Sequence, residues 1–490
     1  MFDKLKQLAF DTVVYGASIF IGRFLTFMLV PFYTNYIPKD ELGYIMVLFT
    51  GFAFANIVYS FGFESGYFRF ANSGKGEIDE EIQKIVFTHS FVFIASVAIL
   101  GTSLIYLFSG NIADQIEGIE NGALWIKLAA LIPLFDALMF IPYTRLRLKR
   151  KSIRFAITRL ITVIITVALN IYLVTQIDLG GLGVIIAGAV SPFLIGLTFI
   201  PDIVRNFKAK FDKELFKGMF KYSLPTVPAS LSIIALQFID QPILIASVGP
   251  EETAIYAACY KLALPMMLFV SMFEYAWKPF YLSNFGNEGA KTMFSRVLTY
   301  YVATCCFIFL TVSLLIPYIV QIPFRDGHFY EKSFWTGLYI VPIVMGGYFF
   351  NGLFNQFSIG LNITKETKYL PIAVGVAAIV NIVGNILLIP IYGYAAAAWL
   401  TLASYIVSAL LVYYFSQRQY SLSYQWGRIL RSLLITLGFY LSYKFFYSEA
   451  IGNDGLSIPL TLFGTLLVFI ITKTITLSEV KSMMRIFKRR

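Results

Sequence analysis

Long apolar stretches alternate with short polar breaks along the whole chain. Each stretch holds about 20 mainly apolar residues, which is the length that an α-helix needs to cross roughly 30 Å of hydrocarbon. The pattern predicts an all-α, polytopic membrane protein with about 14 transmembrane helices. The expected spans cover residues 12–34, 43–63, 85–108, 122–143, 155–175, 180–200, 222–248, 253–276, 297–320, 334–357, 369–390, 393–415, 429–446 and 456–474.

The positive charge falls almost entirely in every second polar break, and these breaks lie on one side of the predicted membrane. An even number of spans places both termini on one side. When a residue within three positions of a span end is counted with the adjoining loop, 31 of the 39 Lys and Arg residues fall on that side. Only 4 lie on the opposite side, and 4 lie inside spans. Because cytoplasmic loops carry an excess of Lys and Arg, we expect both termini in the cytoplasm.

The composition narrows the class of protein. A content of 58% hydrophobic and 14% charged residues, with a mean hydropathy of +0.72, lies outside the range of ordinary soluble domains. The net charge of +11 comes from Lys and Arg at helix ends, which anionic lipid attracts, so we expect no nucleic-acid partner. The 3 Cys residues fall inside apolar spans without metal-ligand spacing, and we expect neither a metal nor another cofactor.

The chain carries no motif of the common catalytic classes. GxxxxGK[ST], HExxH and GxSxG are all absent, and the longest polar breaks, at residues 64–84 and 202–221, hold only about 20 residues. A phosphate-binding loop, a zinc protease site or a nucleophile elbow would each need one of these motifs. We therefore expect a transporter rather than an enzyme.

The bundle is predicted to contain an internal repeat. A shift of 212 residues lays residues 35–44 over residues 247–256, matching a proline, an acidic turn and a tyrosine. Six spans per repeat is an even number, so the two copies share one orientation. We expect an N-terminal six-helix lobe over 1–205, a C-terminal six-helix lobe over 206–416 and a central cleft. Two further helices and a basic C-terminal tail fill residues 417–490.

Charged residues inside the spans need an explanation, because each costs about 2.5–3.5 kcal/mol at a helix centre. Arg23 lies about 11 residues, or roughly 16 Å, from either end of its span. Its side chain either faces a cavity, where it contacts a substrate, or forms a structural ion pair with the other lobe. Lys127 and Arg159 lie near an interface, which their side chains can reach.

Asp240 and Lys261 are predicted to lie at the same depth on neighbouring helices. Each is about 8 residues from the tight outer turn that joins their spans. A purely structural salt bridge would explain both charges. Alternatively, Lys261 faces the cleft and Asp240 tunes its charge. Both interpretations stay open.

Prolines and polar stripes add detail to these spans. Pro225, Pro228, Pro242 and Pro265 each remove a backbone donor and predict bends in the spans at residues 222–248 and 253–276. Polar residues follow one helical face in two other spans, either to bond neighbouring helices or to bind sugar. These two stripes consist of Asn351, Asn355, Ser358 and Asn362, and of Arg159, Thr162, Thr166 and Asn170.

Several short motifs carry a family resemblance. They are Gly22-Arg23, residues 62–70 (GFESGYFRF), the turn at 240–261, residues 276–280 (AWKPF) and residues 385–393 (NILLIPIYG). With these motifs the chain resembles the polysaccharide transporters of the multidrug/oligosaccharidyl-lipid/polysaccharide exporter superfamily, and the resemblance covers nearly the whole chain. The family often carries Asp-Arg where this chain has Asp240-Gln241, so a basic side chain is missing there.

The resemblance implies a flippase for undecaprenyl-pyrophosphate-linked oligosaccharides in the bacterial inner membrane, working by alternating access. Its partners would be this substrate, membrane lipids, a polysaccharide polymerase and a chain-length regulator. The diphosphate is anionic, and Arg and Lys suit it as a fork and as a point charge. The expected substrate-binding residues are Arg23, Lys261, Arg69, Asn351 and Asn355, and the expected coupling or ion-pair residues are Asp240, Glu64 and Glu274.

Two other functions compete with the flippase. A multidrug or cation antiporter of the same architecture would need uncompensated carboxylates, and Asp136, Asp240 and Glu274 keep it open, whereas Arg23 and Lys261 argue against it. A membrane glycosyltransferase, ligase or polymerase is the third, and the short outer loops argue against that one.

Overall fold

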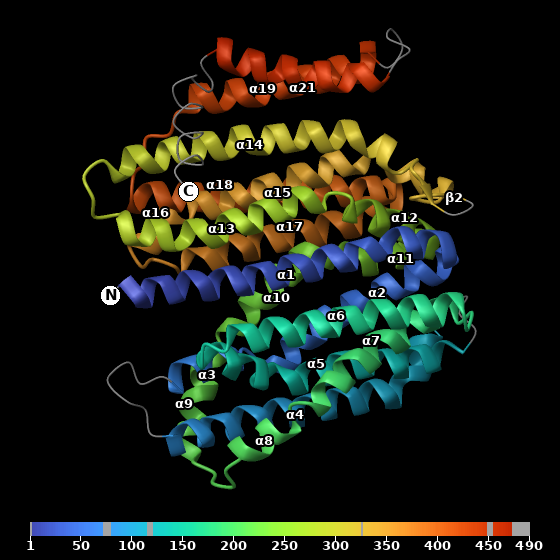
Figure 1. Cartoon of the computed structure of the whole chain (residues 1–490), viewed down its shortest axis with the longest axis vertical. Helices are drawn as coiled ribbons and strands as arrows, with labels where there is room; N and C mark the ends of the chain where they lie inside the picture. The colour runs from blue at the N-terminus through green and yellow to red at the C-terminus, as the bar shows by residue number, and fades with distance from the viewer. Residues whose placement is uncertain (1, 72–79, 115–120, 325–326, 448–453, 473–490) are drawn as a thin grey trace. The chain divides into compact units, whose positions relative to one another are not determined.

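The computed structural model describes residues 2–71, 80–114, 121–324, 327–447 and 454–472. In these ranges the chain is almost entirely α-helical, and every predicted span overlaps a helix (Figure 1). The chain divides into two compact units. Unit 1 comprises residues 1–258 and 378–397, and unit 2 comprises residues 259–377 and 398–490.

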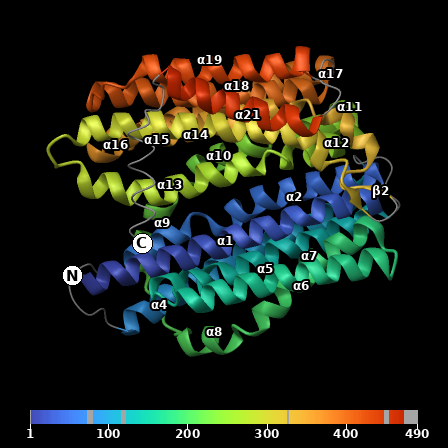
Figure 2. The ribbon, with the colours of Figure 1, turned by 45° about the horizontal axis from the view of Figure 1, so that its top comes forward.

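Unit 1 is built around a bundle of long helices. α1 packs against α6, α6 against α7, and α5 against α4 and α7, so these helices lie side by side in Figures 1 and 2. Shorter helices complete the unit, and its first segment ends at residue 258, within α12. In chain order the helices are α1 (Phe2–Tyr36), α2 (Lys39–Ser60), α3 (Phe63–Phe70), α4 (Glu80–Ala113), α5 (Gly122–Leu148), α6 (Ser152–Thr175), α7 (Gly180–Leu197), α8 (Ile200–Asn206), α9 (Lys213–Ser223), α10 (Thr226–Phe238), α11 (Asp240–Val248) and α12 (Pro250–Lys261).

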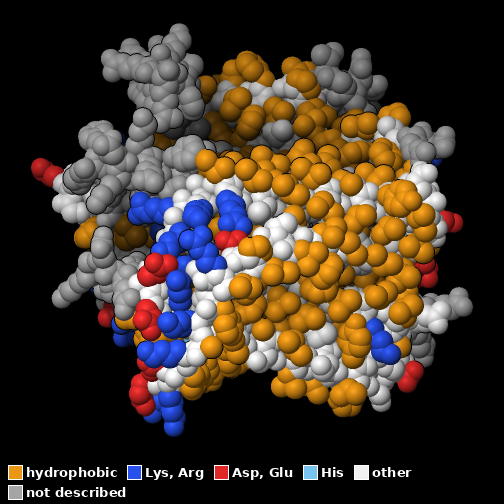
Figure 3. Space-filling model, turned by 60° about the horizontal axis from the view of Figure 1, so that its bottom comes forward, with side chains coloured by type: hydrophobic (Ala, Val, Ile, Leu, Met, Phe, Trp, Pro, Cys, Tyr) orange, Lys and Arg blue, Asp and Glu red, His pale blue; other side chains and the backbone are white. Residues whose placement is uncertain are grey.

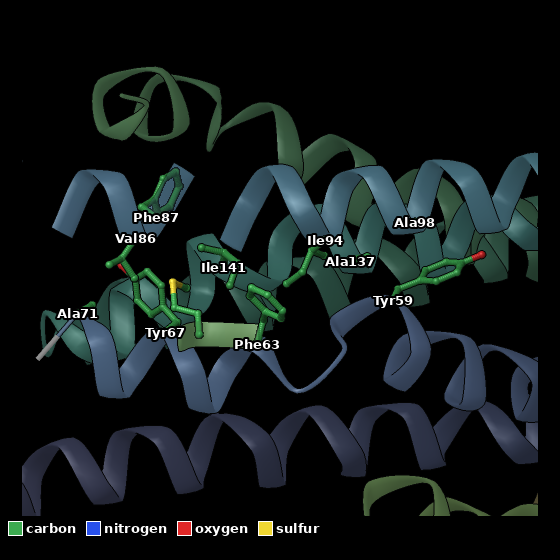
Figure 4. Close-up of a cluster of buried hydrophobic side chains, with 11 residues drawn as sticks. Tyr59, Phe63, Tyr67, Ala71, Val86, Phe87, Ile94, Ala98, Ala137 and Ile141 are labelled. Atoms are coloured by element: carbon green, nitrogen blue, oxygen red, sulfur yellow. The ribbon is translucent and has the colours of Figure 1, made fainter. Parts of the chain in front are cut away.

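A cluster of buried side chains joins α2, α3, α4 and α5 (Figure 4). Phe63 and Tyr67 enter it from α3 and are fully buried, and Phe87 and Ile141 meet them from α4 and α5. The sequence predicted a polar break over residues 64–84, and this was wrong for α3, whose apolar side chains bury themselves in the cluster. A break of about 20 residues therefore contains a packed helix.

Small residues bring α3 and α9 close together. Gly62, at the start of α3, has a φ of 70°, and a Cβ there would lie 2.7 Å from the carbonyl oxygen of Ser223 on α9. A Cβ on Gly66, one turn later, would lie 2.5 Å from the Ser223 hydroxyl. Both distances are below van der Waals contact, so only glycine fits at these two positions without a shift.

Two spans are broken where proline predicted a bend. α10 and α11 meet at 44°, and α12 and α13 meet at 49°. Proline has no N–H, so in a continuous helix Pro242 would leave the carbonyl of Phe238 without a donor, and Pro265 that of Lys261. Phe238 and Lys261 are the last residues of α10 and α12. The helices thus end where the hydrogen bond is lost.

Unit 2 gathers helices of the second half. α14 packs against α13, α15, α19 and α21, and a short antiparallel pair joins Pro323 to His328. The later part of α17 and the start of α18 belong to unit 1. The elements are α13 (Leu264–Asn284), α14 (Ala290–Ile319), β1 (Pro323–Phe324), β2 (Gly327–His328), η1 (Lys332–Gly337), α15 (Ile340–Phe357), α16 (Ile359–Ile363), α17 (Tyr369–Tyr392), α18 (Tyr394–Gln419), α19 (Trp426–Ser442), η2 (Tyr443–Tyr447) and α21 (Asp454–Ile471).

The helices fit a multi-pass membrane protein. Among the described residues, 9 helices are long and apolar enough to span a membrane, or up to 11 if each bent pair is one span. α15, α19 and α21 are shorter or more polar than the others. Much of the face in Figure 3 is hydrophobic, with Lys and Arg gathered in a band at one end. The predicted basic tail beyond residue 472 lies outside the described residues.

The helix bounds follow the predicted repeat. α1 ends at Tyr36 and α11 at Val248, 212 residues later, and α4 begins at Glu80 and α14 at Ala290, 210 residues later. The lobe boundaries at residues 205 and 416 stay a prediction.

Within unit 1, a close contact joins the turn between α1 and α2 to the turn between α11 and α12. A Cβ on Gly43, in the first turns of α2, would overlap the carbonyl oxygen of Pro250 at the start of α12. Nearby, the Glu41 carboxylate accepts the backbone N–H of Gly181 at 2.7 Å. This satisfies a donor at the start of α7 and complements its helix dipole.

Gly43→Ala should lower the free energy of unfolding by about 1–3 kcal/mol, because overpacking a tight contact displaces backbone. Gly51→Ala on the same helix is the matched control, since nothing lies within 4 Å of its Cβ position. Unfolding of the two purified variants in detergent would measure the difference. Equal stability of the two variants would contradict the contact.

Candidate functional site

The first broken span of the structure contains a buried acid. Asp240 is the first residue of α11 and is only 2% exposed. Its carboxylate accepts a hydrogen bond from the Tyr256 hydroxyl on α12. The next residue, Gln241, accepts a hydrogen bond of 2.7 Å from the Thr50 hydroxyl on α2. A negative charge at the N-terminus of α11 also complements that helix's dipole.

The second broken span carries a cation at its break. Lys261 is the last residue of α12 and is partly buried. An ammonium group at the C-terminus of a helix complements the negative end of the dipole. Asp240 falls in unit 1 and Lys261 in unit 2, and their salt bridge stays a prediction.

Arg23 is exposed in the middle of α1. The neighbouring residue Gly22 faces α6, where a Cβ would lie 3.6 Å from the Val163 side chain. Further along, the Tyr33 hydroxyl donates to Asn170 of α6 at 3.0 Å. α1 is therefore fixed on α6 by its other residues, while the Arg23 side chain stays exposed.

The predicted residues of α3 belong to a different part of unit 1. The Arg69 guanidinium lies 4.9 Å from the ring centroid of Tyr222, close to α9. Glu64 forms an ion pair with Arg147 at the end of α5. The pair is partly exposed, so it is worth about 0–1 kcal/mol. The positive charge of Arg147 therefore compensates the negative charge of Glu64.

Two predicted residues meet in unit 2. The Asn355 amide of α15 donates to the Glu274 carboxylate of α13 at 2.7 Å. Asn351 lies one turn earlier on α15 and is partly buried. Further along the stripe, the Asn362 amide donates to the Ser358 carbonyl at 3.0 Å, within its own segment. The stripe thus reaches a neighbouring helix through Asn355.

The stripe of α6 is mainly internal to its helix. The hydroxyls of Thr162 and Thr166 each donate to a carbonyl four residues earlier at 2.8 Å. The Arg159 guanidinium lies 4.3 Å from the Tyr143 ring centroid, a cation–π contact. In the part of the chain that the structure describes, no group of three or more His, Cys, Asp or Glu could hold a metal ion.

Sequence reasoning missed the neutral partners of the predicted charges. Tyr256 donates a hydrogen bond to Asp240 and Thr50 donates one to Gln241, yet a tyrosine or threonine in an apolar span gives no sign that it faces an acid or an amide. The repeat was the one signal that singled out Tyr256, because a shift of 212 residues lays it over Tyr44.

The fold resembles solved transporters. A lipid II flippase, MurJ, in its inward closed conformation is similar with a TM-score of 0.74 and 16% identity, covering 93% of this chain and 98% of that one. A multidrug resistance MATE family transporter of the MOP superfamily in its inward-facing conformation gives 0.60 and 13%, covering 84% and 96%. A MOP superfamily transporter from Pyrococcus furiosus gives 0.57 and 13%, covering 86% and 96%.

At such identities the likeness is one of fold, and it defines the class of architecture as a polytopic bundle of helices. No curated protein matches the sequence. The polysaccharide biosynthesis protein family matches residues 8–285, more than half of the chain, and the protein belongs to this family.

Asp240→Leu should destabilise the protein by about 1–3 kcal/mol, because the buried Tyr256 hydroxyl loses its carboxylate acceptor. Asp240→Asn keeps an acceptor oxygen and is the matched control, expected close to the unchanged protein. Thermal unfolding in detergent would compare them. If the Asn variant lost as much stability as the Leu variant, the negative charge itself would be the stabilising feature.

Proposed function

We propose that this protein is a flippase that moves undecaprenyl-pyrophosphate-linked oligosaccharides across the bacterial inner membrane for O-antigen, capsule or exopolysaccharide synthesis. It works by alternating access, has both termini in the cytoplasm and carries out no catalytic step of its own. The membership of the polysaccharide biosynthesis family supports this function. The fold likeness to a flippase of another lipid-linked cargo supports it as well.

The exposed guanidinium of Arg23 in the middle of an apolar helix is the observation that carries the choice of cargo. Holding a cation at that depth costs free energy, which an anionic cargo offsets. A pyrophosphate is such an anion, and a guanidinium binds two of its oxygens at once. Lys261, at the break of the second span, is the second phosphate contact, and Arg69 is the third.

The amides of Asn351 and Asn355 are the proposed contacts to the sugar. Amide groups both donate and accept hydrogen bonds, as sugar hydroxyls do. Glu274 holds Asn355 from the neighbouring helix, so this carboxylate orients the amide and can respond to protons. Asp240 is the other proposed coupling acid, whereas the ion pair with Arg147 supports a structural role for Glu64.

The two breaks supply the moving parts of the proposed cycle. A helix interrupted by Pro242 or Pro265 lacks a backbone hydrogen bond at the break and bends there at low cost. Interrupted helices of this kind mark binding sites in transporters. The lobes over 1–205 and 206–416 would exchange access around them. A polysaccharide polymerase and a chain-length regulator are the proposed downstream partners.

A cation or multidrug antiporter is the second candidate. The exposed carboxylate of Glu274 and the fold likeness to a multidrug transporter favour it. Its cargo is cationic and would be repelled by Arg23 and Lys261, so the two functions predict opposite effects of removing these charges.

Arg23→Ala should lower the rate of lipid-linked oligosaccharide transport at least about tenfold, because a charge-assisted hydrogen bond to phosphate is lost. Surface polysaccharide in a flippase-deficient strain, and flipping in proteoliposomes, would measure the loss. Lys127→Gln, which removes an intramembrane cation near an interface, is the matched control and should retain transport. Unchanged export by the Arg23 variant together with altered dye efflux would favour the antiporter instead.

Exchanging the two charges at the breaks tests whether they act only on each other. The double variant Asp240→Lys with Lys261→Asp should insert and lose transport, because an acid then stands where the phosphate contact is needed. Size-exclusion chromatography would establish a folded protein before the flipping assay. Retained transport in the folded double variant would mean that the pair is purely structural.

A further inference from the structure

A basic pocket lies in unit 1, apart from the broken spans. It has a volume of about 200 Å³ and is formed by the start of α4, the end of α5 and α8. Its charged lining consists of Arg145, Lys149, Lys151, Arg205, Glu80 and Asp202. The band of Lys and Arg side chains in Figure 3 shows how such residues gather at one end of the molecule.

The two acids of the pocket are committed to other cations. Asp202 accepts two hydrogen bonds from Arg154 of α6, one of them 3.0 Å long. Glu80 pairs with Lys84 on the same helix at 3.4 Å. Among the described residues, no carboxylate lies within ion-pairing distance of the four pocket cations. The pocket therefore holds an excess of positive charge.

One cation of the pocket is held in position. The Arg145 guanidinium lies 5.6 Å from the ring centroid of Phe87 and contacts the Tyr67 hydroxyl at 3.5 Å. Phe87 and Tyr67 are both buried in the cluster of Figure 4. A guanidinium fixed on a rigid core loses little conformational freedom when it binds a ligand.

The cations also repel one another. Burial lowers the pKa of Lys149, and the charges of Arg145 and Lys151 lower it further, against the opposing effect of Glu80. Lys149 follows the last residue of α5, outside the span. A bound anion would relieve this repulsion and raise the pKa again, so binding and charge are linked.

The surroundings of the pocket are apolar and exposed. Phe199 forms part of its wall. Beside it, Ile200 and Val204 of α8 are 49% and 69% exposed, and Ile153 of α6 is 56% exposed. Exposed branched side chains next to a cluster of cations match a ligand that has both an anionic group and hydrocarbon chains.

We propose that this pocket binds the phosphate group of an anionic membrane phospholipid, such as phosphatidylglycerol. The fork of Arg145 and the ammonium groups of Lys149 and Lys151 hold the phosphate oxygens, while the acyl chains run along α6 and α8. Basic pockets between membrane helices bind lipid head groups in this way. None of the proposed cargo contacts lines this pocket, and lipid binding there does not depend on the proposed transport.

The test measures lipid binding to the full-length protein by native mass spectrometry, with phosphatidylglycerol and phosphatidylcholine as probes. The double variant Lys149→Gln with Lys151→Gln should lose affinity for phosphatidylglycerol by about fivefold per cation removed. Binding of phosphatidylcholine should not change. Lys149→Gln alone gives the same comparison if the double variant does not insert.

Arg150→Gln is the matched control, because Arg150 stands between Lys149 and Lys151 but does not line the pocket. It should change the affinity less than twofold. An equal loss in this control would mean diffuse attraction to a basic surface and would overturn the site. Displacement of the lipid by an equal concentration of inorganic phosphate, at constant ionic strength, would assign the pocket to free phosphate and overturn the lipid.

Discussion

The architecture depends on the need of every backbone N–H and C=O group in hydrocarbon for an internal partner. Helices meet this need, which is why long apolar helices dominate the described chain. The exceptions follow the same rule. Pro242 and Pro265 each withhold one donor, and the helices end four residues earlier, at Phe238 and Lys261. The positions of the two prolines therefore determine the breaks, and each break leaves helix ends within an apolar segment.

Helix ends attract charge, and this links the breaks to the candidate site. Asp240 begins one half-helix and Lys261 ends another, each with the sign that its helix dipole favours. Asp240 is also held by a tyrosine hydroxyl from the following helix. Arg23 differs, because it stands in an unbroken helix with no such dipole to stabilise it. Of the three charges, it is the one that most needs an external anion.

The sequence predicted the helices well and their contacts poorly. Hydropathy locates spans because burial in lipid acts on about 20 consecutive residues together, and proline positions located both bends. α3 was missed because its 8 residues are too few to dominate a hydropathy average over about 20 residues. In addition, Glu64 and Arg69 make its sequence look polar. The ion pair of Glu64 joins residues 83 positions apart, a separation that only the fold can bring together.

The approach of α3 to α9 sets a limit on how the chain can vary. At positions 62 and 66 the neighbouring backbone and hydroxyl leave no room for a methyl group, and at position 62 the φ of 70° also disfavours a side chain. Leu107 on α4 is 76% exposed. Its side chain is little constrained by neighbouring residues, so apolar side chains of other shapes should be tolerated there. In distant relatives, positions 62 and 66 should therefore keep small residues even where the exposed apolar residues have all changed.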